Sequence, residues 1–594
     1  MNWSQELLLS AIWLGKAFAI TLVCSLLAGW SLLHFSRWGR QFWRLSGDLF
    51  RPSLNGWRPV LSLLVIVLLT LSGVRLNVLF SRWYNEMYTS LQKLDAKLFW
   101  ASILIFAILA TVHVSRILLN TYLSQGFLIR WREWLNERLL TRWLDHQAYY
   151  RSEHLAKPAD NPDQRIQQDI ASFVNSSLSL SMGVIGSLVS IFEFTLILWG
   201  LSGTLALLGV EVPRGMVFAV YLYVIIATVF AFRIGRPLIM LNFLNEKLGA
   251  DYRYALVRLR EYSESIAFYG GEAVEGSTLR LRFAKIISNA WAIVFRTLKF
   301  SGFNLTISQT AAIFPFVIQA PRFFAKQISL GDMIQTANAF GELQDGLSFF
   351  RSAYDEFAGF KAVLDRLTGF LDAVEGAAAL PTPRVRDHAR RVELQNVSIR
   401  TPAGRVLLDC ATMHVNAESS MLIRGPSGSG KTTLLRAIAG LWPYCDGVIL
   451  HPHDVLFLSQ KPYLPLGSLR AALCYPHPAT GNEAVSEALE AVHLGHLQSR
   501  LDEEADWSHI LSLGEQQRLA FGRLLLAAPA VAFLDEATSA MDEELEDTLY
   551  RLVRERLPHT ALVSVGHRST LLVHHAQILQ LDGKGGWQLA TINS

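Results

Sequence analysis

The stretch SMLIRGPSGSGKTTLLRAIAG, residues 420–440, decides the fold of the last third of this 594-residue chain. A short apolar run, typical of a buried strand, leads into a glycine-rich loop that matches G-x-x-x-x-G-K-[ST], and an apolar helix pattern follows. Glycines let backbone N–H groups close around phosphate oxygens, and the amino end of the following helix favours an anion. The stretch therefore predicts a strand–loop–helix unit that binds the phosphates of a nucleotide.

The residue types in this loop suit a Mg²⁺-bound triphosphate such as ATP. Lys431 is expected to reach the β- and γ-phosphates, and the Thr432 hydroxyl is expected to hold Mg²⁺. A second motif, VAFLDEATSAMD at 531–542, reads as a buried strand that ends in two acids. Asp535 would anchor Mg²⁺, and Glu536 would polarise the attacking water as a general base. The other loop residues expected to contact ATP are Gly425, Pro426, Ser427, Gly428, Ser429, Gly430 and Thr433.

Two more polar residues follow strand-like runs. Gln460 comes after VLFLS and His567 comes after ALVSVG. Such residues are usually only surface residues, but their order relative to the two motifs favours a shared site. Gln460 is predicted to contact Mg²⁺ and the attacking water, and His567 to hydrogen-bond the γ-phosphate. Strand-like and helix-like runs alternate over this region, which predicts an α/β domain with a largely parallel sheet at 392–594.

The first part of the chain reads as a membrane domain. The whole chain is 51% hydrophobic with mean hydropathy +0.27, which is high for a soluble protein. Several windows reach the roughly 20 apolar residues needed to cross a bilayer. We predict spans at 17–35, 60–80, 99–121, 178–202, 216–235, 303–321 and 333–351. The last two are more polar, which fits helices that line a wet cavity; a soluble helix at 333–351 is the alternative.

The predicted organisation is an α-helical membrane bundle followed by an α/β P-loop ATPase domain. Residues 1–56 hold an extra N-terminal helix and a basic amphipathic segment, and 57–371 hold six core helices. Residues 372–391, rich in Pro and charge, are the expected linker. Basic flanks place 36–58, 124–176 and 236–298 on the cytoplasmic side. Helical patterns continue into the two long cytoplasmic loops, with a break expected at Gly270–Gly271. The 17–35 segment could also be a signal peptide or an interfacial elbow helix.

Charged residues inside predicted spans are costly and often functional. Glu193 falls inside 178–202, so it is a possible substrate or proton contact in a cavity; the alternative is pairing with a neighbouring helix. His113 and Arg116 lie inside 99–121 in the same way. Arg75 lies near the outer end of its span and is expected to extend to the interface.

Charge and cysteine content limit the function classes. The net charge is only +4, from 54 basic and 50 acidic residues, which does not indicate a nucleic-acid-binding protein. The four cysteines show no metal-binding spacing, so reduced thiols are expected in place of disulfides.

The order of these motifs resembles the ATPase of ATP-binding cassette (ABC) transporters. The loop at 425–433 corresponds to Walker A, Gln460 to the Q-loop, LSLGEQQR at 511–518 to the signature, 531–536 to Walker B and His567 to the switch histidine. The resemblance implies that two ATPase domains meet head to tail and that the signature completes the partner's ATP site. The residues assigned to that role are Ser512, Leu513, Gly514 and Glu515, with Ser539 and Asp542 in the D-loop.

Further stretches resemble one branch of this family. They include GLWPYCDG (440–447), NPDQRIQQD (161–169), ESIAFYGGE (264–272) and GDMIQTANAFGELQ (331–344). The branch is that of SbmA/BacA-related transporters with a fused ATPase (YddA-like), close to the peroxisomal acyl-CoA half-transporters and a mycobacterial cobalamin and peptide transporter group. Glu515, in place of the usual Gln, also occurs there. Thr401 stands where many relatives have an adenine-stacking aromatic.

The resemblance implies a homodimer of half-transporters in the lipid bilayer of the bacterial inner membrane, with the ATPase in the cytoplasm. ATP would drive bulky hydrophilic solutes, such as peptides or cobalamin-like compounds, across the membrane by alternating access. An exporter or flippase of lipid or acyl substrates is the alternative. A membrane-anchored regulatory ATPase without transport is a third reading.

Overall fold

The computed structural model describes residues 3–155, 157–158, 160–203, 205–207, 210–387, 391–416, 419–478 and 481–592. The chain divides into two compact units. The helical unit comprises Met1–Thr141 and Asp160–Leu371. The α/β unit comprises Arg142–Ala159 and Asp372–Ser594, so a short segment from within the first half of the chain belongs to the second unit.

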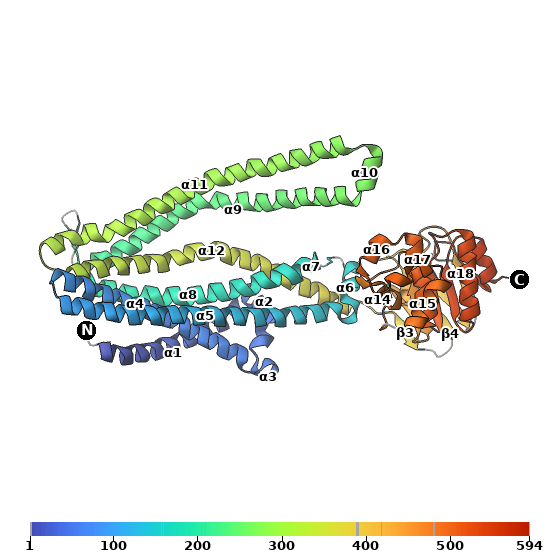
Figure 1. Ribbon diagram of the computed structural model, residues 1–594, viewed down its shortest axis with the longest axis horizontal. Helices are drawn as coiled ribbons and strands as arrows, with labels where there is room; N and C mark the ends of the chain where they lie inside the picture. The colour runs from blue at the N-terminus through green and yellow to red at the C-terminus, as the bar shows by residue number, and fades with distance from the viewer. Residues whose placement is uncertain are drawn as a thin grey trace. The chain divides into compact units, whose positions relative to one another are not determined.

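Long helices dominate the helical unit (Figure 1). They are α1 (Trp3–Phe35), α4 (Arg58–Gln92), α5 (Ala96–Leu144), α8 (Ile170–Leu201), α9 (Gly215–Glu261), α11 (Glu272–Phe324) and α12 (Leu330–Ala379). Shorter elements join them: α2 (Arg37–Ser46), η1 (Gly47–Phe50), α3 (Pro52–Asn55), α7 (Pro162–Gln164), η4 (Arg165–Asp169), β1 (Leu205–Leu207), β2 (Val210–Val212) and α10 (Ser263–Tyr269).

The predicted spans lie within these long helices. Among the described residues, five segments are long and apolar enough to cross a membrane: 5–35, 58–92, 96–154, 162–201 and 215–261. The weaker predicted spans, 303–321 and 333–351, lie in α11 and α12. Phe340 and Leu343 of α12 are buried with Phe194 and Leu198 of α8. Residues 333–351 therefore pack in the bundle, which argues against the soluble-helix alternative.

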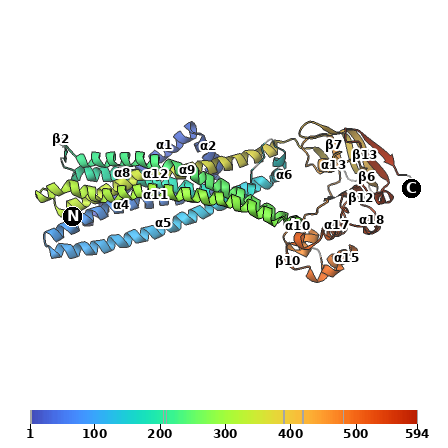
Figure 2. The same ribbon diagram turned by 90° about the horizontal axis from the view of Figure 1, so that it is seen from above.

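Helices α9 and α11 form a long antiparallel pair joined by α10. Figure 1 shows the pair diverging from α4, α8 and α12 toward α10, and Figure 2 shows the two helices together from above. Near the β1–β2 hairpin, Val220 of α9 and Ala311 of α11 are buried in the bundle core. At the other end Phe268 and Tyr269 are 81% and 89% exposed. The predicted break is present, since Gly270 takes φ +60° between α10 and α11.

Two sheets form the core of the α/β unit. One has strand order β14-β13-β6-β12-β11-β8 and is parallel except for β13–β14; the other has order β3-β7-β4-β5. The strands of these two sheets are β3 (Arg384–Asp387), β4 (Arg391–Arg400), β5 (Val406–Asn416), β6 (Ser420–Arg424), β7 (Cys445–His451), β8 (Val455–Leu458), β11 (Val531–Asp535), β12 (Ala561–Val565), β13 (Gln577–Leu581) and β14 (Trp587–Thr591). Two further short strands, β9 (Gly467–Ser468) and β10 (Glu504–Ala505), pair with each other.

The remaining elements of this unit are helical. They are η2 (Asp145–Gln147), α6 (Ala148–Arg151), η3 (Ser152–His154), α13 (Lys431–Ile438), α14 (Leu469–Cys474), α15 (Asn482–Ala491), η5 (Gly495–Arg500), α16 (Trp507–Ile510), α17 (Leu513–Ala527), α18 (Glu543–Arg556) and η6 (Thr570–His574).

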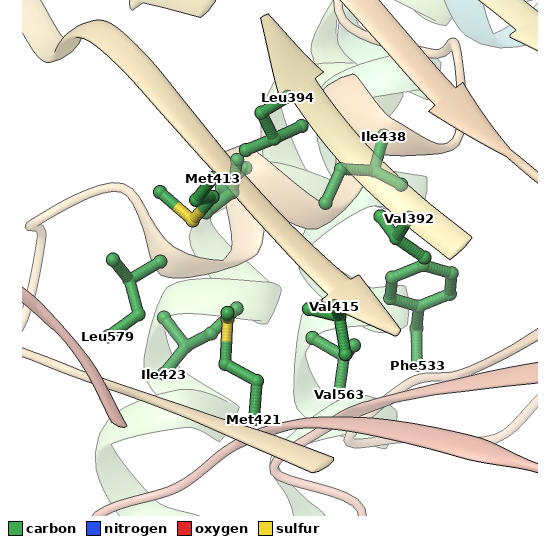
Figure 3. Close-up of a pocket in the computed structure, with 11 residues that line it drawn as sticks. Val392, Leu394, Met413, Val415, Met421, Ile423, Ile438, Phe533, Val563 and Leu579 are labelled. Atoms are coloured by element: carbon green, nitrogen blue, oxygen red, sulfur yellow. The ribbon is translucent and has the colours of Figure 1, made fainter. Parts of the chain in front are cut away.

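Alternation along the parallel strands explains how this sheet is covered on both faces. Phe533 of β11 packs in one apolar cluster, with α13 and the second sheet, while its neighbour Leu534 packs in the other, with α14, α15, α17 and α18. Figure 3 shows a small gap between the two sheets, lined by aliphatic, methionine and phenylalanine side chains such as Met413, Met421 and Phe533. An apolar gap of this kind stays dry, so it belongs to the core and is not a ligand site.

The predicted linker at 372–391 begins at the unit boundary, since the α/β unit resumes at Asp372, and it contains regular structure. Helix α12 continues to Ala379, and Arg384–Asp387 form β3, which pairs in parallel with β7. Residues 388–390 lie outside the described residues. The run of small residues AVEGAAA suits a helix that packs closely, and Val374 and Ala377 are buried.

Candidate functional site

The glycine-rich loop lies between β6 and α13, as the motif requires. Gly428 and Gly430 take φ +75° and +96°, a region that L side chains rarely adopt. Lys431 is buried, and its Nζ donates to the carbonyl oxygens of Gly425 (3.0 Å) and Pro426 (3.1 Å). The loop therefore wraps around its own ammonium group, and a phosphate bound in the loop would meet this cation and the amino end of α13.

One buried polar atom of the loop has no protein partner. Ser429 Oγ is inaccessible to solvent and hydrogen-bonds to no described residue. Together with the lysine and the glycine backbone, this free hydroxyl fits a loop built to contact an oxyanion.

The carboxyl end of β11 brings the two acids to this loop. Thr432 Oγ1 donates to Asp535 Oδ1 at 3.2 Å. Burial raises the pKa of the Asp535 carboxyl, and the neighbouring Glu536 charge adds to that effect, while Thr432, Arg436 and Lys431 oppose it. A hydroxyl and one carboxylate are a suitable oxygen pair for Mg²⁺, which binds through few protein ligands together with phosphates and water. No group of three or more His, Cys, Asp or Glu that could hold a metal occurs in the described ranges.

Glu536 and His567 lie together because β11 and β12 are neighbouring parallel strands. Asp535 is in register with Val565, so the residues that follow each strand emerge at the same sheet edge. His567 Nε2 lies 3.5 Å from Glu536 Oε1. Glu536 takes φ +50°, and its N–H donates to the Val565 carbonyl. The left-handed backbone turns the chain at the position of the predicted base, a form of strain found at functional sites.

Gln460 follows β8, the strand on the other side of β11. Its side chain is exposed, and its carbonyl oxygen accepts a hydrogen bond from Gln517 Nε2 at 2.7 Å. The sheet order β12-β11-β8 thus places His567, Asp535 and Gln460 at or just after the ends of three adjacent strands.

The signature stretch begins α17. Ser512 caps the helix through a reciprocal capping box, in which its Oγ accepts from Glu515 N and the Glu515 carboxylate accepts from Ser512 N (2.9 Å). Burial alone would raise the pKa of Glu515, but the hydrogen bonds from Ser512 hold that pKa below its ordinary value. Ser512 and Leu513 are exposed, so this helix start is available to another molecule.

The D-loop packs against this helix start. A Cβ on Gly514 would lie 3.0 Å from the carbonyl oxygen of Ala540, so the two backbones approach closely. Ser539 Oγ accepts a hydrogen bond from Gln517 (3.0 Å). Asp542 caps α18 by accepting from Leu545 N at 2.7 Å, which is a structural contact.

Sequence reasoning missed two buried residues that connect these loops. Gln517 on α17 is 0% exposed and bonds to the backbone or side chains of Gln460, Ser539 and Ala540. Glu546 on α18 is 1% exposed and accepts from Thr538 and Thr570. Their only sequence signal is a polar residue on the inward face of an amphipathic helix, and that signal becomes visible once helix boundaries are known.

Glu193 contacts the N-terminal helix. Its Oε1 accepts a hydrogen bond from Trp13 Nε1 of α1 at 2.8 Å, which matches the neighbouring-helix alternative. The prediction that Arg75 extends to the interface is wrong. Arg75 is 8% exposed and bonds to Glu6 (2.5 Å) and Ser10 (3.0 Å) of α1, because these polar groups offer partners within the bundle.

Other charged residues in the spans are also paired or packed. Arg116 of α5 donates to the Leu69 carbonyl at 3.0 Å, and the His113 ring packs edge-on to Phe80. Thr401 begins a tight turn with Arg405, whose guanidinium donates to the Gly583 carbonyl at 2.8 Å. The turn presents no aromatic ring at this position.

Comparisons with known proteins agree with this geometry. The family profile described as ABC transporter transmembrane region 2 matches residues 45–324, and the profile described as ABC transporter matches 408–539. An uncharacterized ABC transporter ATP-binding protein of Haemophilus influenzae is 51% identical over 593 residues, covering 99% of this chain and 100% of the relative. The chain belongs to the ABC transporter family.

More distant relatives are also ABC transporters. The inner membrane ABC transporter ATP-binding protein YddA of Escherichia coli is 34% identical and covers 86% of this chain and 92% of its own. The human lysosomal cobalamin transporter ABCD4 is 30% identical, covering 78% and 82%. A bacterial Atm1-family ABC exporter with ATP bound has the same fold, with a TM-score of 0.69, 19% identity, and coverage of 90% and 95%.

These comparisons confirm several predictions in their general form. The protein is a membrane ABC transporter with a fused membrane domain and ATPase, of the exporter-type fold, related to YddA and the D-family half-transporters. Its ATPase domain binds ATP and couples ATP hydrolysis to transport.

Proposed function

We propose that the protein works as a homodimer of half-transporters that moves bulky hydrophilic solutes, such as peptides or cobalamin-like compounds, across the bacterial inner membrane. The observation that carries the ATPase part is the convergence of Thr432 with Asp535, and of Glu536 with His567, at one sheet edge beside the phosphate loop. The proposal places the chain in the SbmA/BacA-related branch.

Each residue at this edge has a chemical role in the proposal. Lys431 and the backbone of 425–433 bind and orient the phosphates, and Ser429 adds a hydroxyl donor. Glu536 accepts the proton of the attacking water, and His567, beside it, holds the γ-phosphate. Thr432, Asp535 and Gln460 would hold Mg²⁺, which when bound neutralises charge on the phosphate oxygens.

A second copy of the chain would complete each ATP site. The exposed Ser512–Leu513 helix start, with Gly514 and Glu515, presents the amino end of α17 to an anion but has no catalytic base of its own. The α9–α11 pair also extends beyond its own bundle and ends in the exposed Phe268 and Tyr269. Both features support a partner of the same kind, with two equivalent sites.

The segment Arg142–Ala159 connects helix α5 to the α/β unit. It clusters with the α/β unit, where Tyr444 donates to the His154 carbonyl at 3.1 Å and the Trp442 ring lies 5.0 Å from the His154 ring. Arg151 donates to the Leu380 and Pro381 carbonyls. This docked segment follows directly on α5, so motion of the ATPase would move that helix and switch the direction in which the cavity opens.

Polar contacts between α4 and α12 support a hydrophilic solute. Asn77 donates to Glu342 (3.2 Å), and Asn85 donates to Asp332 (2.9 Å) and Gln335 (2.7 Å). Such groups are costly in lipid and favoured beside water. The similarity to a lysosomal cobalamin transporter points to the same class of solute. A lipid or acyl exporter is the second candidate, because the D-family relatives share this fold.

The replacement Glu536→Gln tests the ATPase site. It removes the base and keeps the shape, so we expect hydrolysis to fall by about a hundredfold or more while ATP binding persists. Phosphate release and ATP binding by the chain in lipid nanodiscs measure the two effects. Hydrolysis at the wild-type rate would contradict the assignment.

Proteoliposomes loaded with ATP test the solute and the direction. Labelled peptide, cobalamin and acyl-lipid probes are compared with the Glu536→Gln chain as control. ATP-dependent movement of the first two supports the proposal. Movement of the lipid probe alone would favour the second candidate.

A further inference from the structure

Gln517 lies at the meeting point of three loops in the α/β unit. It is fully buried on α17, and each of its side-chain polar groups has a partner outside that helix. Nε2 donates to the Gln460 carbonyl (2.7 Å) and to Ser539 Oγ (3.0 Å), while Oε1 accepts from Ala540 N (3.0 Å). One amide thus joins the loop after β8, the loop after β11 and the signature helix.

The neighbouring residue Gln516 provides a natural comparison. It is 4% exposed on the same helix, but its Nε2 donates to the carbonyls of Ser508, in α16, and Leu511, just after α16. Its Oε1 has no partner among the described residues. Both glutamines are buried amides of equal size, yet only Gln517 reaches the nucleotide-site loops.

The contacts of Gln517 are reinforced by backbone packing. Ala540 donates its N–H to Gln517, and its carbonyl oxygen lies close to the position of a Cβ on Gly514. The 539–540 loop is therefore held against the start of α17 at two points. If Gln460 shifts, the amide of Gln517 must either follow it or leave a buried donor unpaired, which is unfavourable.

We infer that Gln517 is a positioning residue. It makes the positions of Ser512–Glu515 and Ser539–Ala540, the segments that this chain presents to its partner, depend on the position of Gln460 in this chain's own ATP site. This rests on the proposed dimer. The residue contacts neither ATP nor the reacting water; it acts through the three loops. Its loss should slow hydrolysis at the completed site and leave ATP binding to the phosphate loop intact.

The test compares Gln517→Leu with Gln516→Leu in the full chain in nanodiscs. Both variants remove a buried amide from the same helix. We expect Gln517→Leu to lower kcat about tenfold or more, with the ATP affinity unchanged within about twofold. Gln516→Leu, which loses contacts only to Ser508 and Leu511, should lower kcat clearly less than Gln517→Leu does. The midpoint of thermal unfolding of each chain reports general damage.

Two further variants keep the test decisive if Gln517→Leu does not fold. Ser539→Ala removes one of the three contacts, and Gln517→Glu retains the acceptor for Ala540 N but loses donation to Gln460. We expect kcat to fall less in the first than in the second, again at constant ATP affinity. Equal kcat values for the Gln516 and Gln517 variants, or normal hydrolysis by Gln517→Glu, would overturn the inference.

Failure of the proposed dimer gives a different result. Hydrolysis per chain would then be the same in nanodiscs that hold one copy as in those that hold two. The positioning role is supported if ATP hydrolysis falls only in nanodiscs that hold two copies, and falls further for Gln517→Leu than for Gln516→Leu.

Discussion

Several buried polar side chains of the α/β unit form the hydrogen bonds or ion pairs that offset the cost of their burial. Glu546 accepts from Thr538, just after Glu536, and from Thr570, in the segment after His567. Arg568 lies 3.6 Å from the same carboxylate. A charge buried this deeply is stable only when paired and hydrogen-bonded. Glu546 therefore ties together the two strand ends that carry the predicted base and the switch histidine.

His575 shows how burial fixes a protonation state. It is 4% exposed; Nδ1 donates to the Leu571 carbonyl (2.7 Å) and Nε2 accepts from Ser564 Oγ (2.8 Å), which defines the neutral tautomer. Burial lowers the pKa of His575 from 6.5 to about 4, and the nearby Arg554 and His574 contribute in the same direction.

This depressed pKa predicts an acid-sensitive fold. Between pH 6.5 and about 4 the unfolded chain binds a proton at His575 that the folded chain does not, so stability falls as the pH falls through this window. At pH 5 the loss from this group is about 2 kcal/mol, or roughly 4–8 °C in the unfolding midpoint. Thermal unfolding of the full chain at pH 7.5 and pH 5 measures it.

His575→Asn is the matched control, because it cannot titrate in this range. The variant chain should lose less stability than wild type between the two pH values. An identical pH dependence for both chains would show that His575 does not carry the effect.

At the scale of elements, α1 is attached to the bundle by polar contacts. Glu6 is 5% exposed and bonds to Arg75 and Arg82 of α4, while Trp13 bonds to Glu193 of α8. The outer face of α1 carries exposed Leu and Ile side chains suited to lipid. In lipid, polar contacts and close packing hold helices together, since burial of apolar surface contributes little there.

Glu6→Ala should therefore loosen α1 and destabilise the helical unit. Removing one partner of a buried ion pair leaves an uncompensated charge, with an expected cost of about 3 kcal/mol. Thermal unfolding in nanodiscs measures this cost. The double variant Glu6→Ala/Arg75→Ala should lose less than the sum of the two single variants, because the second change removes the more deeply buried of the two arginines that pair with Glu6. Additive losses would show that the pair is not coupled.

At the scale of the whole molecule, the proposed dimer has two composite ATP sites, each with a phosphate loop from one chain and a signature from the other. Ser512→Arg would disable the signature and Lys431→Ala the phosphate loop. In a mixed dimer with one variant in each chain, both changes fall on the same site.

The mixed dimer should therefore keep one intact site, whereas each variant paired with itself has none. We expect the mixture to hydrolyse ATP at up to about half the wild-type rate per dimer, and each variant alone at close to background. Phosphate release from dimers purified through two different tags measures this. A mixed dimer as inactive as the single variants would mean that a site requires groups from one chain only, or that both sites must act together.

The predictions from sequence were most successful where local order carries the information. The glycine-rich loop needs particular backbone angles and a following helix, so a window of about ten residues is enough to recognise it. The strands before Asp535, Gln460 and His567 were found because buried parallel strands are continuous apolar runs. Composition did not reveal the helical structure within 372–379, because small residues suit both a flexible connection and a tightly packed helix.

The sequence by itself determined the motif order, the membrane segments and the residues at the strand ends, because each depends on composition within a short window. Only the tertiary structure decided that Glu193 and Arg75 contact α1, that residues 142–159 dock on the α/β unit, and that Gln517 joins three loops. These contacts bring together residues distant in sequence, and a buried polar group accepts whichever partner the fold places within hydrogen-bonding distance. That choice depends on the packing of whole elements, which no local pattern encodes.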